Sequence, residues 1–242
     1  MAGWEDRADP VVDLLVPIKT LSRAKSRLRG AADDGRGEPR AHARLALALA
    51  RDTVAAASAA HRVRRVVVIS SDPEVASTLG ADGTAVLVEG SERGLNPALE
   101  YGARVLRADA PPRPLGALQA DLPALRTEEL DAALAEALAL FATDRARRAF
   151  CADAEGEGTT LLLCAARAPL QPLFGGRSAA RHLASGAVAM DGPWAGLRRD
   201  VDTTENLHEA ALLGLGPATA AVLDLIEHPR AQRRAPAAKP RT

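Results

Sequence analysis

The chain has 242 residues, of which 47% are apolar and 26% charged, as expected for one globular domain with a sizeable core or at most two small domains. Its 31 basic and 31 acidic residues balance, which argues against a general nucleic-acid-binding protein, because such proteins usually carry excess positive charge. Two cysteines without a CxxC pair and five scattered histidines argue against a disulfide scaffold or a zinc site.

The first ten residues, MAGWEDRADP, carry acidic side chains and no apolar stretch, so they are not expected to form a signal peptide. No run approaches the ~18 apolar residues that a membrane span needs. We therefore expect a cytoplasmic protein that binds neither nucleic acid nor membrane.

Strand-like runs alternate with helix-like runs along the whole chain. Strands are predicted over residues 11–19, 63–72, 84–90, 115–121, 147–154, 159–166 and 187–192. Helices are predicted over residues 40–60, 73–79, 97–107, 127–141, 178–184, 206–216 and 217–228. Thr127 is the expected N-cap of the helix 127–141, whose first turn carries Glu128 and Glu129. Strands separated by helices predict βαβ units and a mainly parallel sheet.

We expect a single domain over residues 11–228, preceded by an N-terminal extension at residues 1–10. The polar, glycine-rich segment GAADDGRGEPR predicts a flexible insertion at about residues 30–40. The segment 229–242 has five basic residues, three prolines and no acidic residue, which predicts a disordered basic tail.

The turn after the first predicted strand, VPIKTLSRAKSRLRG, is strongly cationic. It contains neither GxxxxGKS nor GxGxxG, so it is neither a Walker loop nor a dinucleotide fingerprint. Cations at this position can still bind a triphosphate, with lysine as a point charge and arginine as a bidentate fork. A solvated basic loop would explain the same pattern. The cations are Lys19, Arg23, Lys25, Arg27 and Arg29.

Acidic residues stand at two expected strand ends. Asp121 stands where the strand of LQADLPAL is expected to end, and LRRDVDTTENL places Asp200 and Asp202 two residues apart. In an extended segment this spacing puts both carboxylates on one face. Together with Asp121 they could bind Mg²⁺, which takes carboxylate and phosphate oxygens. Two alternatives stay open: Asp202 could instead cap the following helix, and Asp121 could serve only the turn.

Two glycine-rich turns precede apolar elements. DAEGEGTTLLL places Gly156, Gly158 and Thr159 before a strand, and FGGRSAARHLASG places Gly175, Gly176 and Ser178 before a short helix, followed by Arg181 and His182. Glycines let backbone N–H groups approach an anion. With Ser178 as the expected N-cap, this region could bind a small carboxylate or phosphate. A purely structural role for the turns is the alternative.

The chain resembles the guanylyltransferases of coenzyme F-420 biosynthesis, the family that includes phosphoenolpyruvate and 2-phospho-L-lactate guanylyltransferases. The segments that carry the resemblance span about residues 12–216 and are VPIKTLSRAKSRL, GLNPAL, QADLPAL, ADAEGEGTTLL, FGGRSAARH and GLRRDVDTTENL. The combination of the last three is the most specific part.

The resemblance implies an α/β, Rossmann-like nucleotidyltransferase fold with a mostly parallel central sheet flanked by helices. It implies that Lys19, Lys25 and Arg27 hold the GTP triphosphate and that Leu95 and Asn96 lie near the nucleotide. Mg²⁺ would be bound by Asp121, Asp200 and Asp202. The acid would be bound by Thr159, Gly175 and Ser178. The implied catalytic residues are Lys25, Arg27 and Asp121.

The implied reaction is transfer of GMP from GTP to phosphoenolpyruvate, with hand-over of the product to the next enzyme of coenzyme F-420 biosynthesis. The Ala/Arg/Gly-rich composition suggests a GC-rich genome such as that of an actinobacterium, where family members are associated with phosphoenolpyruvate. The alternatives are 2-phospho-L-lactate or another phosphorylated acceptor, such as molybdopterin or a sugar phosphate. The latter class would show an LAGGxSxRxGxxK loop, which is missing here. A nucleotide-binding regulator without turnover would lack the metal carboxylates.

The sequence departs from the pattern of related transferases at two places. Gln119 and Ala120 precede Asp121, so the first acidic residue of a DxD motif is missing and the number of metal ions stays open. The insertion from Asp33 to Pro39 lengthens the loop after the cationic segment, so the details of a lid do not transfer from the family.

Overall fold

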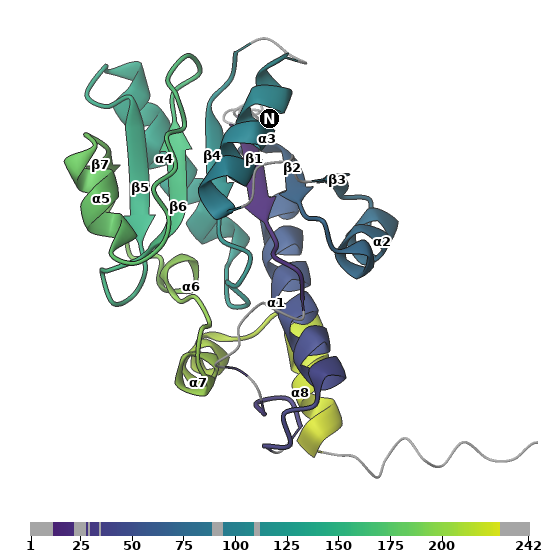
Figure 1. Ribbon diagram of the computed structural model, residues 1–242. Helices are drawn as coiled ribbons and strands as arrows, with labels where there is room; N and C mark the ends of the chain where they lie inside the picture. The colour runs from purple at the N-terminus through teal and green to yellow at the C-terminus, as the bar shows by residue number, and fades with distance from the viewer. Residues whose placement is uncertain are drawn as a thin grey trace, which may run out of the picture.

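The computed structural model describes residues 12–21, 28, 30–33, 35–88, 94–108 and 112–227. Its centre is a sheet with the strand order β3-β2-β1-β4-β6-β5-β7, and helices cover both faces (Figure 1). The strands are β1 (Val12–Pro17), β2 (Val63–Ile69), β3 (Ala85–Leu87), β4 (Leu115–Leu118), β5 (Arg148–Ala152), β6 (Thr159–Cys164) and β7 (Val188–Ala189).

The sheet is mostly parallel, and β6 is the reversed strand. β1 pairs in parallel with β2 and β4, β2 with β3, and β5 with β7. β6 is antiparallel to both of its neighbours, β4 and β5. A short connection joins β5 to β6, whereas a parallel pair would need a long crossover. As a result β6 begins at the sheet edge where β1, β4 and β5 end.

The helices are α1 (Pro39–Ala59), α2 (Pro73–Ala81), α3 (Leu95–Ala108), α4 (Thr127–Ala142), α5 (Ser178–Ala184), α6 (Ala195–Arg198), α7 (Thr204–Leu213) and α8 (Pro217–Glu227). Among the described residues, none of these helices is both long enough and apolar enough to cross a membrane.

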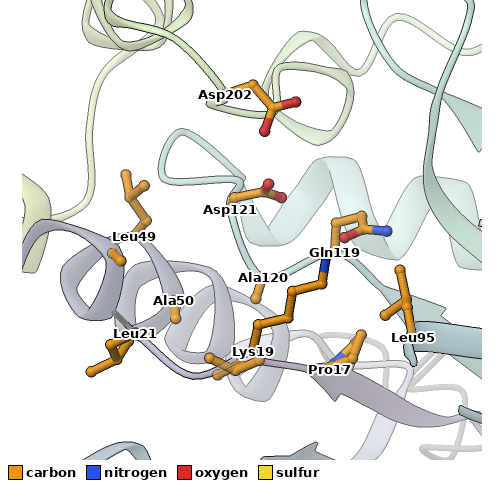
Figure 2. Close-up of a pocket in the computed structure, with 12 residues that line it drawn as sticks. Pro17, Lys19, Leu21, Leu49, Ala50, Leu95, Gln119, Ala120, Asp121 and Asp202 are labelled. Carbon is orange, nitrogen blue, oxygen red and sulfur yellow. The ribbon is translucent and has the colours of Figure 1, made fainter. Parts of the chain in front are cut away.

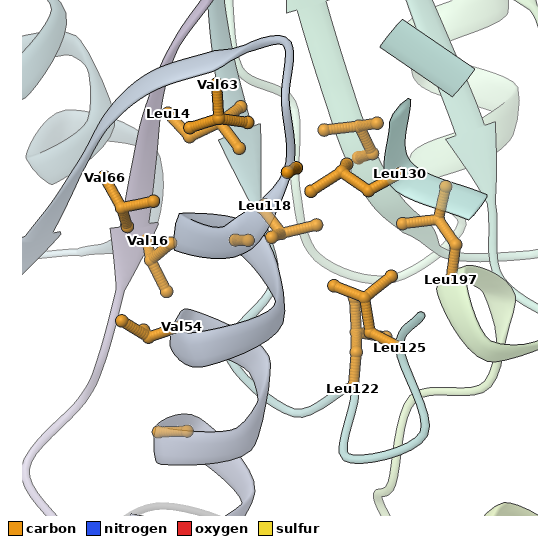
Figure 3. Packing of buried hydrophobic residues seen from close by; sticks show 14 of the residues in the cluster. Leu14, Val16, Val54, Val63, Val66, Leu118, Leu122, Leu125, Leu130 and Leu197 are labelled. Carbon is orange, nitrogen blue, oxygen red and sulfur yellow. The ribbon is translucent and has the colours of Figure 1, made fainter. Parts of the chain in front are cut away.

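Alternation of side chains along the strands divides the core between the two faces of the sheet. Leu14 and Val16 of β1 pack with Val54 of α1 and Leu130 of α4 on one face (Figure 3). Leu15, between them in sequence, packs with residues of α3 on the other face. The resulting three layers place α1, α2 and α4 on one side and α3 and α5 on the other.

A third apolar cluster lies beyond the edge of the sheet, where the first half of α1 meets α7 and α8 (Figure 1). Buried Asp52 of α1 fixes α8 there, because its carboxylate accepts hydrogen bonds from the backbone N–H groups of Ala218 (2.9 Å) and Thr219 (2.7 Å). These two N–H groups belong to the first turn of α8, where a helix has no internal partners for them. The same cluster includes Val201 and Ala124, which flank the candidate site.

Several local predictions were wrong. β4 ends at Leu118, three residues before Asp121. Arg126 occupies the N-cap position of α4, and Thr127 instead donates its hydroxyl to the carbonyl of Ala56 (3.3 Å). The four-residue helix α6 was not predicted, because one turn is too short to show a helical period.

The described part of the predicted insertion, residues 30–33 and 35–40, contains a turn. Gly35 donates to the carbonyl of Gly30 (2.9 Å), and the Asp33 carboxylate accepts from the N–H of Gly37 (3.0 Å). Ala32 packs against the cluster formed by α1, α7 and α8. Pro39 and Arg40 already belong to α1. Flexibility of this segment stays a prediction. The N-terminal extension and the basic tail lie outside the described residues.

Candidate active site

The segment after β1 is held by the following strand and helix. Ile18 donates its N–H to the carbonyl of Ile69 (2.9 Å). Leu21 donates its N–H to the carboxylate of buried Asp72 (2.9 Å), which also caps α2 through the N–H of Glu74 (2.9 Å). Asp72 was not predicted as part of the site, although an aspartate before a proline is a common helix start. Lys25 and Arg27 lie outside the described residues.

A cavity of about 180 Å³ opens where β1 and β4 end, beside α1. Exposed Lys19 lies on its wall. Its side chain points toward the segment that follows β4 and contains Gln119 and Asp121 (Figure 2). A second cavity of about 210 Å³ shares Lys19 and Leu95 with the first. The first is lined by Pro17, Ile18, Lys19, Leu21, Ala46, Leu49, Ala50, Leu95, Gln119, Ala120, Asp121 and Asp202.

Asp121 is presented by a turn that α1 holds in place. After β4, Gln119 donates its N–H to the carbonyl of Thr160 in β6 (2.8 Å). A second contact comes from Thr53 of α1, which is buried. Its hydroxyl group accepts a hydrogen bond from the N–H of Leu122 (2.9 Å) and donates one to the carbonyl of Leu49 (2.9 Å). Asp121 is only 8% exposed. Thr53 was missed because a threonine inside a helix gives no sequence signal for such a contact.

Asp200 and Asp202 come from the segment between α6 and α7, so their predicted position at a strand end was wrong. Val201, between them, is fully buried and donates its N–H to the carbonyl of Asp121 (3.0 Å). The helix after this segment is capped by Thr203, whose hydroxyl oxygen accepts from the N–H of Asn206 (3.2 Å). The alternative in which Asp202 caps this helix is therefore wrong.

The three aspartates lie close together, and two of them, Asp121 and Asp202, line the first cavity. Asp121, Asp200 and Asp202 each offer a carboxylate oxygen, and these atoms lie within 4.8 Å of one another. Figure 2 shows the carboxylates of Asp121 and Asp202 facing each other from two separate segments. At such distances the mutual repulsion of carboxylates is about 1 kcal/mol per pair in water and larger near a protein surface. A divalent cation would relieve this repulsion.

A second acidic group overlaps the first and consists of Asp153, Glu155 and Asp200. Two of its members already have other partners. Asp153 accepts the N–H groups of Glu157 (2.8 Å) and Gly158 (2.7 Å), so it shapes the turn before β6. Glu155 forms an ion pair with Arg199 (2.6 Å).

Thr159 opens β6 at the same sheet edge as the aspartates. It is 5% exposed, and its hydroxyl lies 2.9 Å from Nδ1 of His182 in α5. His182 is completely buried, and its Nε2 accepts the N–H of Leu173 (2.9 Å). Burial lowers the pKa of His182 from 6.5 to about 4, with a further contribution from Arg148 and Arg181. The imidazole is therefore neutral near pH 7.

Gly175 and Ser178 lie at the start of α5. Gly175 has φ of +118°, a conformation that favours glycine. Ser178 is 2% exposed and is the first residue of the helix, while Arg177 in a left-handed conformation occupies the N-cap position. The prediction of Ser178 as N-cap was therefore wrong. Ala179 donates its N–H to the carbonyl of Glu157 (3.0 Å), which ties α5 to the turn before β6.

Leu95 and Asn96 form the first turn of α3. Leu95 lines both cavities. The Asn96 amide makes two hydrogen bonds with the backbone of Phe174, accepting from its N–H (2.9 Å) and donating to its carbonyl (3.1 Å). Asn96 thus connects the cavity wall to the loop that leads into Gly175.

Comparisons with known proteins agree with this fold and extend over nearly the whole chain. A family model described as "Guanylyl transferase CofC like" matches residues 12–228. The phosphoenolpyruvate guanylyltransferase of Geodermatophilus obscurus is 50% identical over 210 residues, covering 87% of this chain and 93% of that protein. The phosphoenolpyruvate guanylyltransferase of Salinispora arenicola is 49% identical over 207 residues, covering 86% and 91%.

Among solved structures, a nucleotidyl transferase from Methanothermobacter matches with a TM-score of 0.55 at 16% identity, covering 84% of this chain and 97% of that one. At this identity the likeness shows the fold alone, which is the Rossmann-like fold of nucleotidyltransferases with a mostly parallel sheet flanked by helices.

Proposed function

The chain belongs to the CofC-like guanylyl transferase family and is a guanylyltransferase, and we propose that it transfers GMP from GTP to phosphoenolpyruvate. The products would be enolpyruvoyl-2-diphospho-5'-guanosine and diphosphate. The names of the relatives from G. obscurus and S. arenicola support this acceptor. In this proposal the reaction is a step of coenzyme F-420 biosynthesis, and the product passes to the next enzyme of that pathway.

The observation that carries the proposal is the group of three carboxylates beside the cavity after β1, two of which, Asp121 and Asp202, line it. Its donor set fits Mg²⁺, because hard divalent cations prefer carboxylate and phosphate oxygens. We propose that Asp121, Asp200 and Asp202 hold this ion. When bound, Mg²⁺ would neutralise negative charge on the phosphates of both substrates. Asp202 is exposed, so the group is accessible from the cavity.

The nucleotide is assigned to the cavities on either side of Lys19. The ammonium group of Lys19 would attract the triphosphate, and Leu95 would contact the nucleoside through its apolar side chain. Asn96 would act mainly by fixing this wall, since two of its amide atoms already bond Phe174. Lys25 and Arg27, which lie outside the described residues, are proposed as further ligands of the triphosphate and as catalytic residues with Asp121.

The acid is assigned to the edge formed by Thr159, Gly175 and Ser178. Phosphoenolpyruvate carries a carboxylate and a phosphate, both of which accept hydrogen bonds and donate none at neutral pH. Hydroxyl groups and backbone N–H groups are suitable donors for such an anion. Thr159 begins β6, which hydrogen-bonds through Thr160 to the chain segment leading to Asp121. In this proposal the acid would lie beside the group of three carboxylates.

In the proposed reaction an oxygen of the acceptor phosphate attacks the α-phosphorus of GTP in line. A new P–O bond forms, the bond to the β-phosphate oxygen breaks, and diphosphate leaves with the electron pair. A phosphate monoester is largely dianionic at neutral pH, since its second pKa is about 6. The chain therefore needs no general base, and its residues act by positioning the two anions and by balancing their charge.

The test is to incubate the protein with GTP and Mg²⁺ and either phosphoenolpyruvate or 2-phospho-L-lactate, following diphosphate release. We expect release with phosphoenolpyruvate, and mass spectrometry should find the guanylylated acid. Omission of Mg²⁺ and addition of excess chelator are the controls. Release with 2-phospho-L-lactate alone would overturn the proposed acceptor, and binding of GTP without release in either mixture would favour a regulator.

A further inference from the structure

His182 uses both of its ring nitrogens inside the core. The ring is completely buried between two aromatic rings, with centroid distances of 5.8 Å to Phe150 and 5.2 Å to Phe174. Nδ1 lies 2.9 Å from the hydroxyl oxygen of Thr159, and Nε2 lies 2.9 Å from the backbone nitrogen of Leu173. The imidazole therefore joins the first residue of β6 to the loop before Gly175.

The direction of these two bonds follows from the chemistry of the partners. A backbone N–H can only donate, so Nε2 of His182 must accept the bond from Leu173. A neutral imidazole then carries its proton on Nδ1, and this N–H donates to the oxygen of Thr159. The Thr159 oxygen acts as acceptor in this contact, so its own O–H can donate to another group.

We propose that His182 is a positioning residue for the acid substrate: it turns the Thr159 hydroxyl into a donor toward the bound anion and fixes the loop that leads to Gly175. This inference rests on the proposed assignment of the acid to Thr159, Gly175 and Ser178. The opposite tautomer would make Thr159 donate to the imidazole. An acceptor oxygen would then face the anion, which would weaken binding.

The surroundings of His182 keep this arrangement constant with pH. A protonated imidazole would carry N–H groups on both nitrogens, and one of them would face the N–H of Leu173. Burial and the nearby Arg148 and Arg181 lower the pKa of His182 to about 4, so the neutral ring persists well below neutral pH. The guanidinium groups belong to β5 and α5, the two elements that flank the ring.

Asn96 provides further hydrogen bonds to the loop that precedes Gly175. His182 binds the N–H of Leu173, and the Asn96 amide binds the N–H and the carbonyl of Phe174. Two successive residues are thus fixed immediately before Gly175. The loop is held at a defined distance from Thr159, which is what two groups need to bind the same small anion.

The test compares His182→Gln, which keeps an acceptor near Nε2, with His182→Asn, which keeps a donor near Nδ1. We expect His182→Gln to raise KM for phosphoenolpyruvate about tenfold or more, as for a lost hydrogen bond to a charged group. His182→Asn should raise KM for phosphoenolpyruvate much less than His182→Gln does. KM for GTP should change by less than about twofold in both variants. Exposed His61, at the opposite end of the sheet, supplies the control His61→Gln, expected to match wild type.

A double-mutant cycle separates positioning from general damage. Thr159→Val should itself raise KM for phosphoenolpyruvate, and adding His182→Gln to it should raise KM by less than about twofold more. An unchanged KM for phosphoenolpyruvate in His182→Gln, equal increases for both substrates, or a full additional effect in the Thr159→Val background would overturn the inference.

Nitrogen NMR of the imidazole in the wild-type protein provides a measurement that needs no variant. We expect a neutral ring protonated on Nδ1, and protonation on Nε2 would overturn the inference. This measurement does not depend on the acceptor. Failure of wild-type protein to release diphosphate with phosphoenolpyruvate would instead refute the proposed function.

Discussion

Replacing Thr53 by valine should release the turn that presents Asp121. Thr53 is fully buried, and its hydroxyl oxygen is the acceptor for the N–H of Leu122 at 2.9 Å. Valine has nearly the same shape but no oxygen, so this amide would stay buried without a partner. Leaving a buried donor unsatisfied costs about 1–3 kcal/mol. For a chain of this size, each kcal/mol lowers Tm by roughly 2–4 °C.

The same substitution should reduce activity, because Leu122 directly follows Asp121. We expect kcat/KM to fall about tenfold or more, since small displacements of a catalytic group are costly. Thermal unfolding and diphosphate release measure the two effects on one preparation. Thr53→Ser keeps the hydroxyl and is the matched control. If Thr53→Val equals wild type in both assays, or if Thr53→Ser loses as much, the hydroxyl does not hold this turn.

Three further predictions concern the carboxylates, the buried histidine and a tight helix contact. Asp121→Asn should abolish turnover while the circular dichroism spectrum stays that of wild type; normal activity would refute its assignment as a metal ligand. His182 has a pKa of about 4 in the folded protein, against an ordinary value of 6.5. Between these pH values the unfolded chain binds more protons than the folded protein. The free energy of unfolding should therefore fall as the pH is lowered from 6.5 to 4. The contribution is roughly 3 kcal/mol, and urea unfolding of His182→Asn should show a correspondingly flatter pH dependence; parallel curves would contradict this. Gly196→Ala would bring Cβ into steric overlap with the carbonyl oxygen of Ala124 and should destabilise the protein by about 1–3 kcal/mol. Gly80→Ala in α2 meets open space and should stabilise it by about 0.4–1 kcal/mol, so equal effects of the two substitutions on urea unfolding would refute the contact.

The layered fold could be predicted because its strands are short runs of aliphatic and β-branched residues between amphipathic helices. VVDLLVPIK and VRRVVVISSD became β1 and β2, which are neighbouring inner strands of the sheet. The reversed direction of β6 was not predicted, although the short DAEGEG connection after β5 contained the signal. Helix ends were less predictable, because the residues that serve as caps depend on the local path of the chain, as for Arg126 and Arg177.

The spacing of Asp200 and Asp202 predicted that both would share a face, and their approach to Asp121 was predicted from strand ends. The approach is confirmed, but its premise was wrong, because β4 ends at Leu118 and Asp200 and Asp202 lie between α6 and α7. The supporting contacts could not be predicted in this way. Leu21 and Asp72 are separated by 51 residues, and Asn96 and Phe174 by 78 residues. Such pairs come together only through tertiary packing, and the motifs that contain Leu21, Asn96 and Phe174 do not show which residues will meet. The roles of Lys25 and Arg27 stay predictions.

In the proposed assignment, two separate stretches of the chain bind the two substrates, and the reversed strand β6 belongs to the second stretch. The cavity walls come mainly from residues 17–121, whereas the residues assigned to the acid fall within residues 148–185 and form a hairpin with its own short helix. The stretch assigned to the acid, within residues 148–185, could therefore change in evolution while the cavity walls assigned to the nucleotide stay the same. A chimera that takes the hairpin from a relative with another acceptor would be expected to change the choice of acid and retain that of GTP.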